Sequence, residues 1–402
     1  MYEDLRKLSY KLKNIEEYQQ IYQDRFNSVN SLHLDFEING NTAFLLYPPE
    51  TLILLEKIYK TDKAISALCA KLPPAAVQQF AFKCLIDEII LTNKIEGVKS
   101  SRRQISDILN DLDSKSTSKK QKQRFEGLVK NYCLLSTHET ISLNTCEDIR
   151  TLYNTLVLDE VLQDDKNNAP DGKLFRKDMV DVKTVTDKVI HNGVFPEEKI
   201  ICCLEKALKI LHDDTLPKLV SLSLFHYLFE YIHPFYDGNG RLGRYILSYT
   251  IKNELEPILA YRLSYTIHER KNEYEEAFKI CNDSKNKGDL TPFILMMLSF
   301  IEQSTVNLYE GLDKRYTLWK QYLTKLSEMN GLDSLSRGLC DLLIQAALFA
   351  EDGISTQELL SYMNIARGTL GSKLKTLAEK NLLIKNKIGN KNYYKLDLDK
   401  LS

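Results

Sequence analysis

Hydrophobic residues recur at helical spacing along most of the chain, which predicts a mainly α-helical protein. A largely apolar stretch from Ala75 to about Lys94 ends at Glu96-Gly97, where the glycine is placed as a helix stop. Further helices are predicted over 197–210, 216–231 and 242–254. The second of these has an almost continuous apolar face, so we expect it to be buried.

Three regions depart from simple helical spacing. Between Asp164 and Pro196 a polar turn cluster is followed by short β-branched runs, which predicts a β-hairpin. In the last segment a helix and a helix-turn-helix pattern precede two alternating strands joined at Gly389-Asn390, an order typical of a winged helix. Roughly the first 70 residues, with one loop at Asn39-Gly40-Asn41, are expected to form an irregular helical arm.

These patterns predict a mostly α fold in four parts. An N-terminal helical region covers 1–110, and a core that contains the hairpin covers 111–305. The Ser- and Lys-rich stretch 114–122 is expected to be an exposed loop. A connecting helix over 306–335 then leads into the winged-helix domain, 336–402.

Composition adds limits to this picture. The 402 residues are 43% hydrophobic. The 54 basic and 55 acidic residues nearly balance, so the net charge of the chain does not attract it to nucleic acid or to membranes. The apolar stretches fall short of the ~18 residues that a membrane span needs, and the N-terminus lacks the features of a signal peptide. The eight cysteines show no zinc-site spacing and are interpreted as reduced core residues. We expect a soluble, cytoplasmic protein.

The stretch His233-Pro-Phe-Tyr-Asp-Gly-Asn-Gly-Arg-Leu-Gly-Arg244 has the residue types of a phosphate-binding turn. Gly238 and Gly240 permit positive φ angles and close backbone approach, so successive N–H groups can turn toward anionic oxygens. The helix that follows adds its N-terminal dipole, and Arg241 and Arg244 lie one turn apart on it. These features predict a site for a polyphosphate.

Two residues of this stretch indicate the chemistry. Phosphate would repel Asp237 unless a divalent cation lies between them, which favours Mg²⁺. His233 precedes the turn and is placed as a base for a hydroxyl that attacks the held phosphate. The predicted reaction class is phosphoryl or nucleotidyl transfer.

The loop resembles the signature H-P-F-x-D-G-N-G-R-x-x-R of the Fic (Fido) family and matches every specified position, a chance event on the order of 10⁻⁹. The resemblance implies a Fic-type helical domain that transfers AMP from ATP, with Mg²⁺, to a Tyr, Thr or Ser hydroxyl of a target protein. It implies that His233 deprotonates the hydroxyl, that Asp237 holds Mg²⁺ and that Phe235 anchors the loop. The residues it implies in nucleotide binding are Gly238, Asn239, Gly240, Arg241, Leu242, Gly243 and Arg244, the last of them at the γ-phosphate.

The resemblance extends more diffusely over about Leu85 to Phe300. The β-prone segment Phe175 to Val194 corresponds to the family's flap, which pairs with an extended segment of the target. The flap residues are assigned as Val180, Asp181, Val182 and Lys183. Tyr274 and Asn282 lie in stretches that resemble the adenine-side segment, and they are left open between the adenine pocket and core packing.

Upstream, Thr92-Asn-Lys-Ile-Glu96-Gly97 resembles the family's inhibitory motif, S/T-x-x-x-E-G/N. A glutamate at a helix end next to the phosphate-binding turn would form an ion pair with an arginine of that turn. The arginine would then be unable to bind the γ-phosphate. We therefore expect Glu96 to inhibit the enzyme through Arg244. In the family the equivalent glutamate can also align a water that removes AMP from a modified target, so de-AMPylation stays an alternative dominant activity.

The C-terminal segment leaves a second function class open. Residues 365–395 carry a net charge of +7, which suits phosphate contacts on DNA. Many winged helices serve only protein contacts or dimerisation, and 367–373 offers few side chains that read bases. The alternative is a DNA-binding regulator with a nucleotide-sensing domain, and a homodimer is a further possibility. The histidines assigned to surface or core are His191, His212 and His226.

Overall fold

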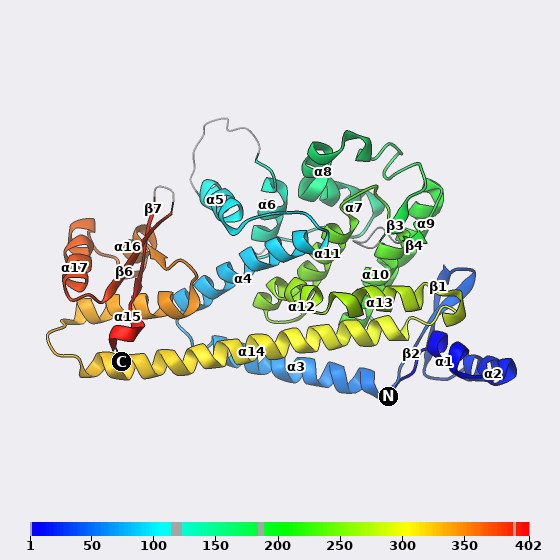
Figure 1. Ribbon diagram of the computed structural model, residues 1–402, viewed down its shortest axis with the longest axis horizontal. Helices are drawn as coiled ribbons and strands as arrows, with labels where there is room; N and C mark the ends of the chain where they lie inside the picture. The colour runs from blue at the N-terminus through cyan, green and yellow to red at the C-terminus, as the bar shows by residue number, and fades with distance from the viewer. Residues whose placement is uncertain (1, 114–122, 138, 184–188, 389–390, 402) are drawn as a thin grey trace. The chain divides into compact units, whose positions relative to one another are not determined.

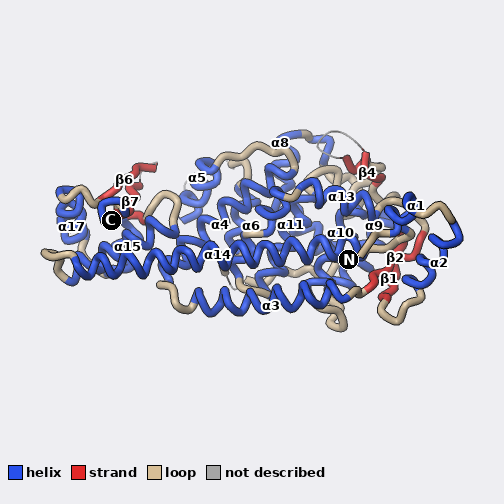
Figure 2. The backbone as a smooth tube through the Cα atoms, turned by 60° about the horizontal axis from the view of Figure 1, so that its bottom comes forward, coloured by secondary structure: helices blue, strands red, loops and turns tan. Residues whose placement is uncertain are grey.

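The computed structural model describes residues 2–113, 123–137, 139–183, 189–388 and 391–401. Helices dominate these residues (Figure 1), and the strands belong to small sheets of two or three strands (Figure 2). The mostly α fold predicted from hydrophobic spacing is confirmed. No helix within the described ranges is both long and apolar enough to cross a membrane. The chain divides into two compact units, Met1–Asp62 with Asp87–Thr305, and Lys63–Ile86 with Val306–Ser402.

The centre of the first unit is α10 (Lys218–Ile232), which packs between α9 (Glu197–Leu211) and α11 (Asn239–Glu254) (Figure 1). As expected from its continuous apolar face, nearly all of α10 is buried. The other helices of this unit are α1 (Leu5–Lys11), α2 (Ile15–Phe26), α5 (Arg102–Asp113), α6 (Glu126–Leu134), α7 (Cys146–Tyr153), the π-helical turn η1 (Asn154–Leu158), α8 (Asp159–Asp164), η2 (Lys166–Asn168), η3 (Pro257–Tyr261), α12 (Leu263–Glu269), α13 (Lys271–Cys281) and η4 (Ser284–Asn286).

The N-terminal arm is not wholly helical, so this part of the prediction was wrong. After α2 the chain forms an antiparallel hairpin of β1 (Ser31–Ile38) and β2 (Asn41–Leu46). Both turn residues are left-handed, with φ of 48° at Asn39 and 74° at Gly40, which is the Asn-Gly hairpin turn. The hairpin packs onto the unit through Phe44, whose N–H and carbonyl bond to the backbone on either side of Asp289.

Three long helices belong in part to each unit: α3 (Pro49–Cys69), α4 (Pro74–Ile95) and α14 (Thr291–Glu328). The boundary expected between residues 305 and 306 lies within the continuous helix α14, at the position where the two units divide. The predicted stop of α4 is present, because Gly97 is left-handed (φ 76°) and donates to the Lys94 carbonyl, while Val98 donates to Asn93. This bonding pattern closes a helix C-terminus and fixes the direction in which Glu96 leaves it.

The predicted hairpin after residue 164 is also present. Strand β3 (Asp181–Lys183) pairs antiparallel with β4 (Val189–Asn192). Residues 184–188, which fall within the predicted β-prone segment, lie outside the described residues, as does the loop expected over 114–122.

The second unit ends in the elements predicted for a winged helix. They are α15 (Ser334–Phe349), β5 (Ile354–Ser355), α16 (Thr356–Met363), α17 (Arg367–Glu379), β6 (Leu383–Ile388), β7 (Lys391–Leu396) and η5 (Leu398–Leu401), with the strands ordered β5-β7-β6. Their shared core contains Leu343, Leu370 and Leu374. The predicted turn at Gly389-Asn390 lies outside the described residues.

Candidate active site

The loop between α10 and α11 is held at both ends and in its middle. His233 ends α10 with a left-handed backbone (φ 52°), and Gly238 precedes α11 with φ of 83°. The Asn239 side chain closes the turn, because its oxygen accepts from the Phe235 N–H (3.0 Å) and its nitrogen donates to the Phe235 carbonyl (2.8 Å). Phe235 is buried and stacks on Tyr153, with ring centroids 3.7 Å apart. Since the side chain of Asn239 is used within the loop, an anion here would meet the backbone N–H groups that begin α11.

His233 is buried in its neutral form. Its side chain is 16% exposed, and its Nδ1 lies 3.9 Å from Oε2 of Glu230. Burial lowers the pKa of His233 to about 3, and neighbouring His191 and Arg176 act in the same direction. The imidazole is therefore unprotonated at neutral pH, as a general base must be.

The three guanidinium nitrogens of Arg244 all bond to the end of α4. Nε donates to Oγ1 of Thr92 (2.8 Å), Nη2 donates to the Thr92 carbonyl (3.0 Å), and Nη1 pairs with Oε1 of Glu96 (2.7 Å). Burial opposes ionisation of Glu96, but the Arg244 guanidinium outweighs it and lowers the pKa of the carboxyl. Glu96 is thus a carboxylate held against the second arginine of the signature.

The carboxylate of Glu96 also lies against the loop backbone. A side-chain carbon at Gly240 would be 2.1 Å from Oε1 of Glu96 and 3.0 Å from Nη1 of Arg244. Only glycine leaves room for this approach. An anion bound at the first turn of α11 would compete with Glu96 for the same space and the same arginine.

The first arginine of the signature is paired as well. Nη1 of Arg241 bonds to Oε1 of Glu160 at 2.5 Å, and both side chains are almost fully buried. Glu160 lies in α8, and Arg124 approaches the same oxygen at 3.9 Å. No local pattern in the sequence indicates this contact, because the two residues lie 81 positions apart in the chain.

Two further residues were missed by the sequence reasoning. Glu230 lies one turn before His233, and burial together with the negative charge of Glu96 raises its pKa to about 8. A carboxyl in the apolar run of α10 was a usable signal. Arg176 is fully buried and donates from Nε to the His233 carbonyl (2.8 Å), a contact that its sequence neighbours do not indicate.

The residues assigned to the adenine side lie in polar contacts of the core. Tyr274 is buried, and its hydroxyl bonds to Nε2 of His226 (2.7 Å). Asn282 accepts from the Tyr227 hydroxyl at its side-chain oxygen (2.5 Å), and its carbonyl accepts from the side chain of Asn39. The N-terminal hairpin therefore borders the segment in which a base is expected.

The assigned flap residues lie at the start of the small sheet. Val180 precedes β3 and accepts from the N–H of Gly193 (2.9 Å), while Oδ1 of Asp181 accepts from the Asn192 amide (2.6 Å). Val182 and Lys183 continue β3 in antiparallel register with β4. The four residues assigned to the flap therefore lie just before and within β3, the first strand of a short hairpin.

Asp237 has the chemistry of a single protein ligand to Mg²⁺. Its Oδ1 accepts from the Gly238 N–H (2.5 Å), and its carbonyl accepts from the Tyr153 hydroxyl (3.1 Å), so the side chain is held at the mouth of the turn. The described part of the chain contains no cluster of three or more His, Cys, Asp or Glu suited to a metal. Mg²⁺ is commonly held by one or two carboxylates together with substrate phosphates, and Asp237 fits that mode.

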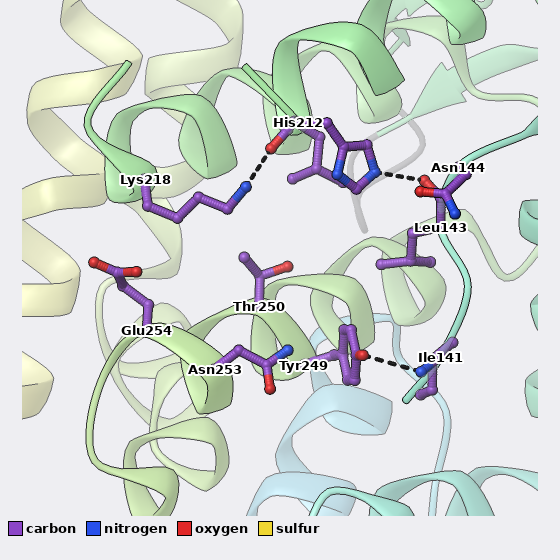
Figure 3. Close-up of a pocket in the computed structure, with 10 residues that line it drawn as sticks. Ile141, Leu143, Asn144, His212, Lys218, Tyr249, Thr250, Asn253 and Glu254 are labelled. Carbon is purple, nitrogen blue, oxygen red and sulfur yellow. Dashed lines mark hydrogen bonds between the residues drawn. The ribbon is translucent and has the colours of Figure 1, made fainter. Parts of the chain in front are cut away.

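A cavity of about 310 Å³ opens elsewhere in the first unit (Figure 3). His212 and Lys218 bond there to the carbonyls of Leu143 and Leu211, and the Tyr249 hydroxyl accepts from the N–H of Ile141. No assigned site residue lines it. Thr250 in its wall lies roughly 16 Å along α11 from the first turn of that helix, so the cavity is separate from the loop.

Comparison with known proteins agrees with the loop geometry. A model of the Fic/DOC family matches residues 144–251. The Protein adenylyltransferase Fic of Drosophila yakuba is 31% identical over 105 residues, which are 26% of this chain and 19% of that protein, and the Drosophila melanogaster protein of that name is 30% identical over 105 residues. The match thus spans about a fifth of the length of these relatives.

A solved structure shares the fold. A Fic family protein from Desulfovibrio desulfuricans G20 aligns with a TM-score of 0.54 at 19% identity, over 87% of this chain and 96% of its own. The segment matched by the family model runs from just before α7 into α11, so it includes the flap and the His233 loop but not Glu96, Tyr274 or Asn282. The chain therefore contains a Fic/DOC family domain, matched over residues 144–251.

Proposed function

We propose that this chain is a protein adenylyltransferase that transfers AMP from ATP to a Tyr, Thr or Ser hydroxyl of a target protein, and that Glu96 holds the activity down. The observation that carries the proposal is the loop after α10. It combines a neutral buried His233 with a glycine-lined helix N-terminus and two buried arginines, Arg241 and Arg244. The names of the Drosophila relatives support the same reaction.

In the proposed step the hydroxyl oxygen of the target attacks the α-phosphorus of ATP. One O–P bond forms, the bond between the α-phosphorus and the bridging oxygen breaks, and pyrophosphate leaves with the electron pair. His233 accepts the hydroxyl proton, for which its neutral form is required. Arg241 and the N–H groups that begin α11 hold the phosphates, where positive charge stabilises the transition state.

Mg²⁺ supplies charge neutralisation between the phosphates when it is bound, and Asp237 is the residue that would hold it. The role of Glu96 follows from its pair with Arg244 and its approach to Gly240. A γ-phosphate that needs Arg244 must displace a carboxylate of the same charge. The intact protein is therefore expected to label slowly.

The test is incubation with α-³²P-ATP and Mg²⁺, with self-labelling as the readout. Three proteins are compared: the native chain, Glu96→Gly, and Glu96→Gly with His233→Ala. The proposal expects strong labelling of the single variant and none of the double variant. Glu328→Gly is the matched control, because Glu328 ends α14, is exposed and lies far outside the loop in sequence.

Labelling that persists without His233 would contradict its role as the base. AMP release from a labelled protein that depends on Glu96 would favour de-AMPylation as the dominant activity.

One observation favours the second candidate, a DNA-binding regulator. Helix α17 exposes Arg367, Gly371 and Lys375, while Lys373 is tied to Asp333 at 2.6 Å. A basic exposed helix after a helix-turn can contact phosphates, and such binding weakens steeply with salt. Failure of Glu96→Gly to label, together with salt-sensitive binding to duplex DNA that Arg367→Ala weakens, would favour this function over transfer.

A further inference from the structure

Arg176 is a fully buried arginine whose hydrogen bonds go to backbone carbonyls. Nε donates to His233 (2.8 Å), Nη1 to Asp178 (2.6 Å), and Nη2 to Val194 (2.8 Å) and Ile232 (3.4 Å). Among the described residues no carboxylate forms an ion pair with it. Four carbonyl dipoles thus compensate the buried charge.

These carbonyls belong to two parts of the molecule. His233 and Ile232 lie where α10 ends and the catalytic loop begins, whereas Asp178 and Val194 flank the flap hairpin on its two sides. The N–H of Val194 also donates to the Ile232 carbonyl (3.0 Å). The guanidinium therefore joins both ends of the hairpin to the residue that carries the base.

A buried charge without a counter-ion is costly to fold, and an apolar side chain of similar size would fill the space at lower cost. The planar fork of a guanidinium reaches several acceptors in fixed directions, which an ammonium cannot do. His233 in addition has a left-handed backbone, and its carbonyl is one of the four acceptors. The contact thus fixes the backbone orientation at the base itself.

Gly193 leaves the space that this arrangement needs. A side-chain carbon there would lie 2.5 Å from Nη2 of Arg176, 3.1 Å from the side chain of Val180 and 3.3 Å from Cβ of His233. The N–H of Gly193 meanwhile bonds to the Val180 carbonyl and closes the base of the hairpin. The first atom displaced by a larger residue would be Nη2 of Arg176.

We propose that Arg176 is a positioning residue that locks the flap hairpin to the His233 loop, so that a target strand on the flap presents its hydroxyl to the base. This inference rests on the proposed transferase function. It assigns target alignment to a residue that contacts neither nucleotide nor hydroxyl, with Gly193 as its steric counterpart.

The test uses the full chain with Glu96→Gly as the active parent. Arg176→Met, Arg176→Lys and Gly193→Ala are each added to it, and Arg103→Met is the control because Arg103 is 86% exposed. Initial self-labelling rates against ATP concentration give kcat and KM, and hydrogen exchange is measured in β4 and in residues 232–235. Misplacement of reacting groups predicts a fall in kcat on the order of 10²-fold for Arg176→Met, with KM for ATP unchanged.

The pH profile separates positioning from general loss of structure. The charge of Arg176 helps to keep His233 neutral, and His191, Glu96 and Glu230 are the other groups that face the ring. Arg176→Met should therefore move the acid limb of kcat to higher pH. Gly193→Ala retains the charge, so it should lower kcat without moving that limb.

A double variant tests whether Gly193 acts through Arg176. Gly193→Ala combined with Arg176→Met should be no slower than Arg176→Met alone, because the displaced fork is already absent. Multiplicative losses would overturn this coupling. Retention of full kcat by folded Arg176→Met or Arg176→Lys would overturn the proposal. If Arg176→Met does not fold, the kcat of Gly193→Ala decides it instead, because that variant displaces the guanidinium without removing it.

Failure of the proposed function can be distinguished from failure of this inference. The proposed function is tested by self-labelling of the Glu96→Gly parent and by the loss of that labelling when His233→Ala is added. If the parent does not label, hydrogen exchange still decides the inference. Faster exchange in β4 and at 232–235 in Arg176→Met, with α11 unchanged, supports it. Unchanged exchange in these segments overturns it.

Discussion

Replacement of Glu96 by glutamine tests whether inhibition depends on charge or on occupied space. Glutamine keeps the size of the side chain and its place at the end of α4, and it removes only the negative charge beside Arg244. The carboxylate lies so close to Gly240 that a purely steric block is a real alternative. A steric block predicts that Glu96→Gln labels as slowly as the native chain.

The structure sets the size of the effect. Hydrogen bonds to charged groups contribute roughly 1.5–3 kcal/mol and neutral ones roughly 0.5–1.5 kcal/mol, so loss of the charge weakens the contact by about 1 kcal/mol. Glu96 is 35% exposed, which places the full contact near the lower end of its range. Since 1–2 kcal/mol is a factor of roughly 5–30, we expect Glu96→Gln to label about fivefold faster than native, and Glu96→Gly faster still.

The assay is the initial rate of self-labelling at subsaturating ATP, with the affinity for ATP measured in parallel. Neither bond from Arg244 to Thr92 involves Glu96, so we expect both to remain in each variant and differences between variants to report Glu96 alone. Equal rates for native and Glu96→Gln, with a fast Glu96→Gly, would refute the electrostatic account. Equal rates for Glu96→Gln and Glu96→Gly would show that the neutral contact contributes nothing.

Three stability predictions address the same region, each read from urea unfolding. Phe235→Ala, which removes the ring stacked on Tyr153, should cost about 3–5 kcal/mol, whereas Phe82→Ala at an exposed site of α4 should change little. Glu160→Leu leaves Arg241 buried without its anion and should lower the free energy of unfolding by about 3–5 kcal/mol. A decrease below about 1 kcal/mol would contradict the interpretation that the pair is buried away from water. Burial raises the pKa of Glu88 to about 7, so the folded state binds the proton more tightly than the unfolded state, and the free energy of unfolding falls as pH rises from about 4.5 past 7. Glu88→Gln should reduce the slope of unfolding free energy against pH over this range, and an unchanged slope would refute this account.

Local signals in the sequence were sufficient for much of the fold. The stop of α4 at Gly97, the buried α10 and the hairpin before Pro196 each follow from a few neighbouring residues, and the structure contains all three. The hairpin at Asn39-Gly40 was missed although its signals were local as well. Apolar residues alternate along β1, with the charged residues at the positions between them, and Asn-Gly is a strong turn pair; the prediction of a helical arm gave the charged, amphipathic stretches more weight than this alternation.

The site divides in a similar way. The geometry of the His233 loop follows from its own residues, because its glycines, asparagine and arginines are adjacent in the chain and act through backbone geometry that adjacent residues fix. The pair of Glu96 with Arg244 was expected from the resemblance of residues 92–97 to the inhibitory motif, whereas Glu160 at Arg241 and Arg176 at the His233 carbonyl emerged only with the tertiary structure. The latter two contacts join residues separated by 81 and 57 positions. Spacing along a chain carries no information about such pairs, since their distance is set by how α8 and the flap pack around α10 and α11.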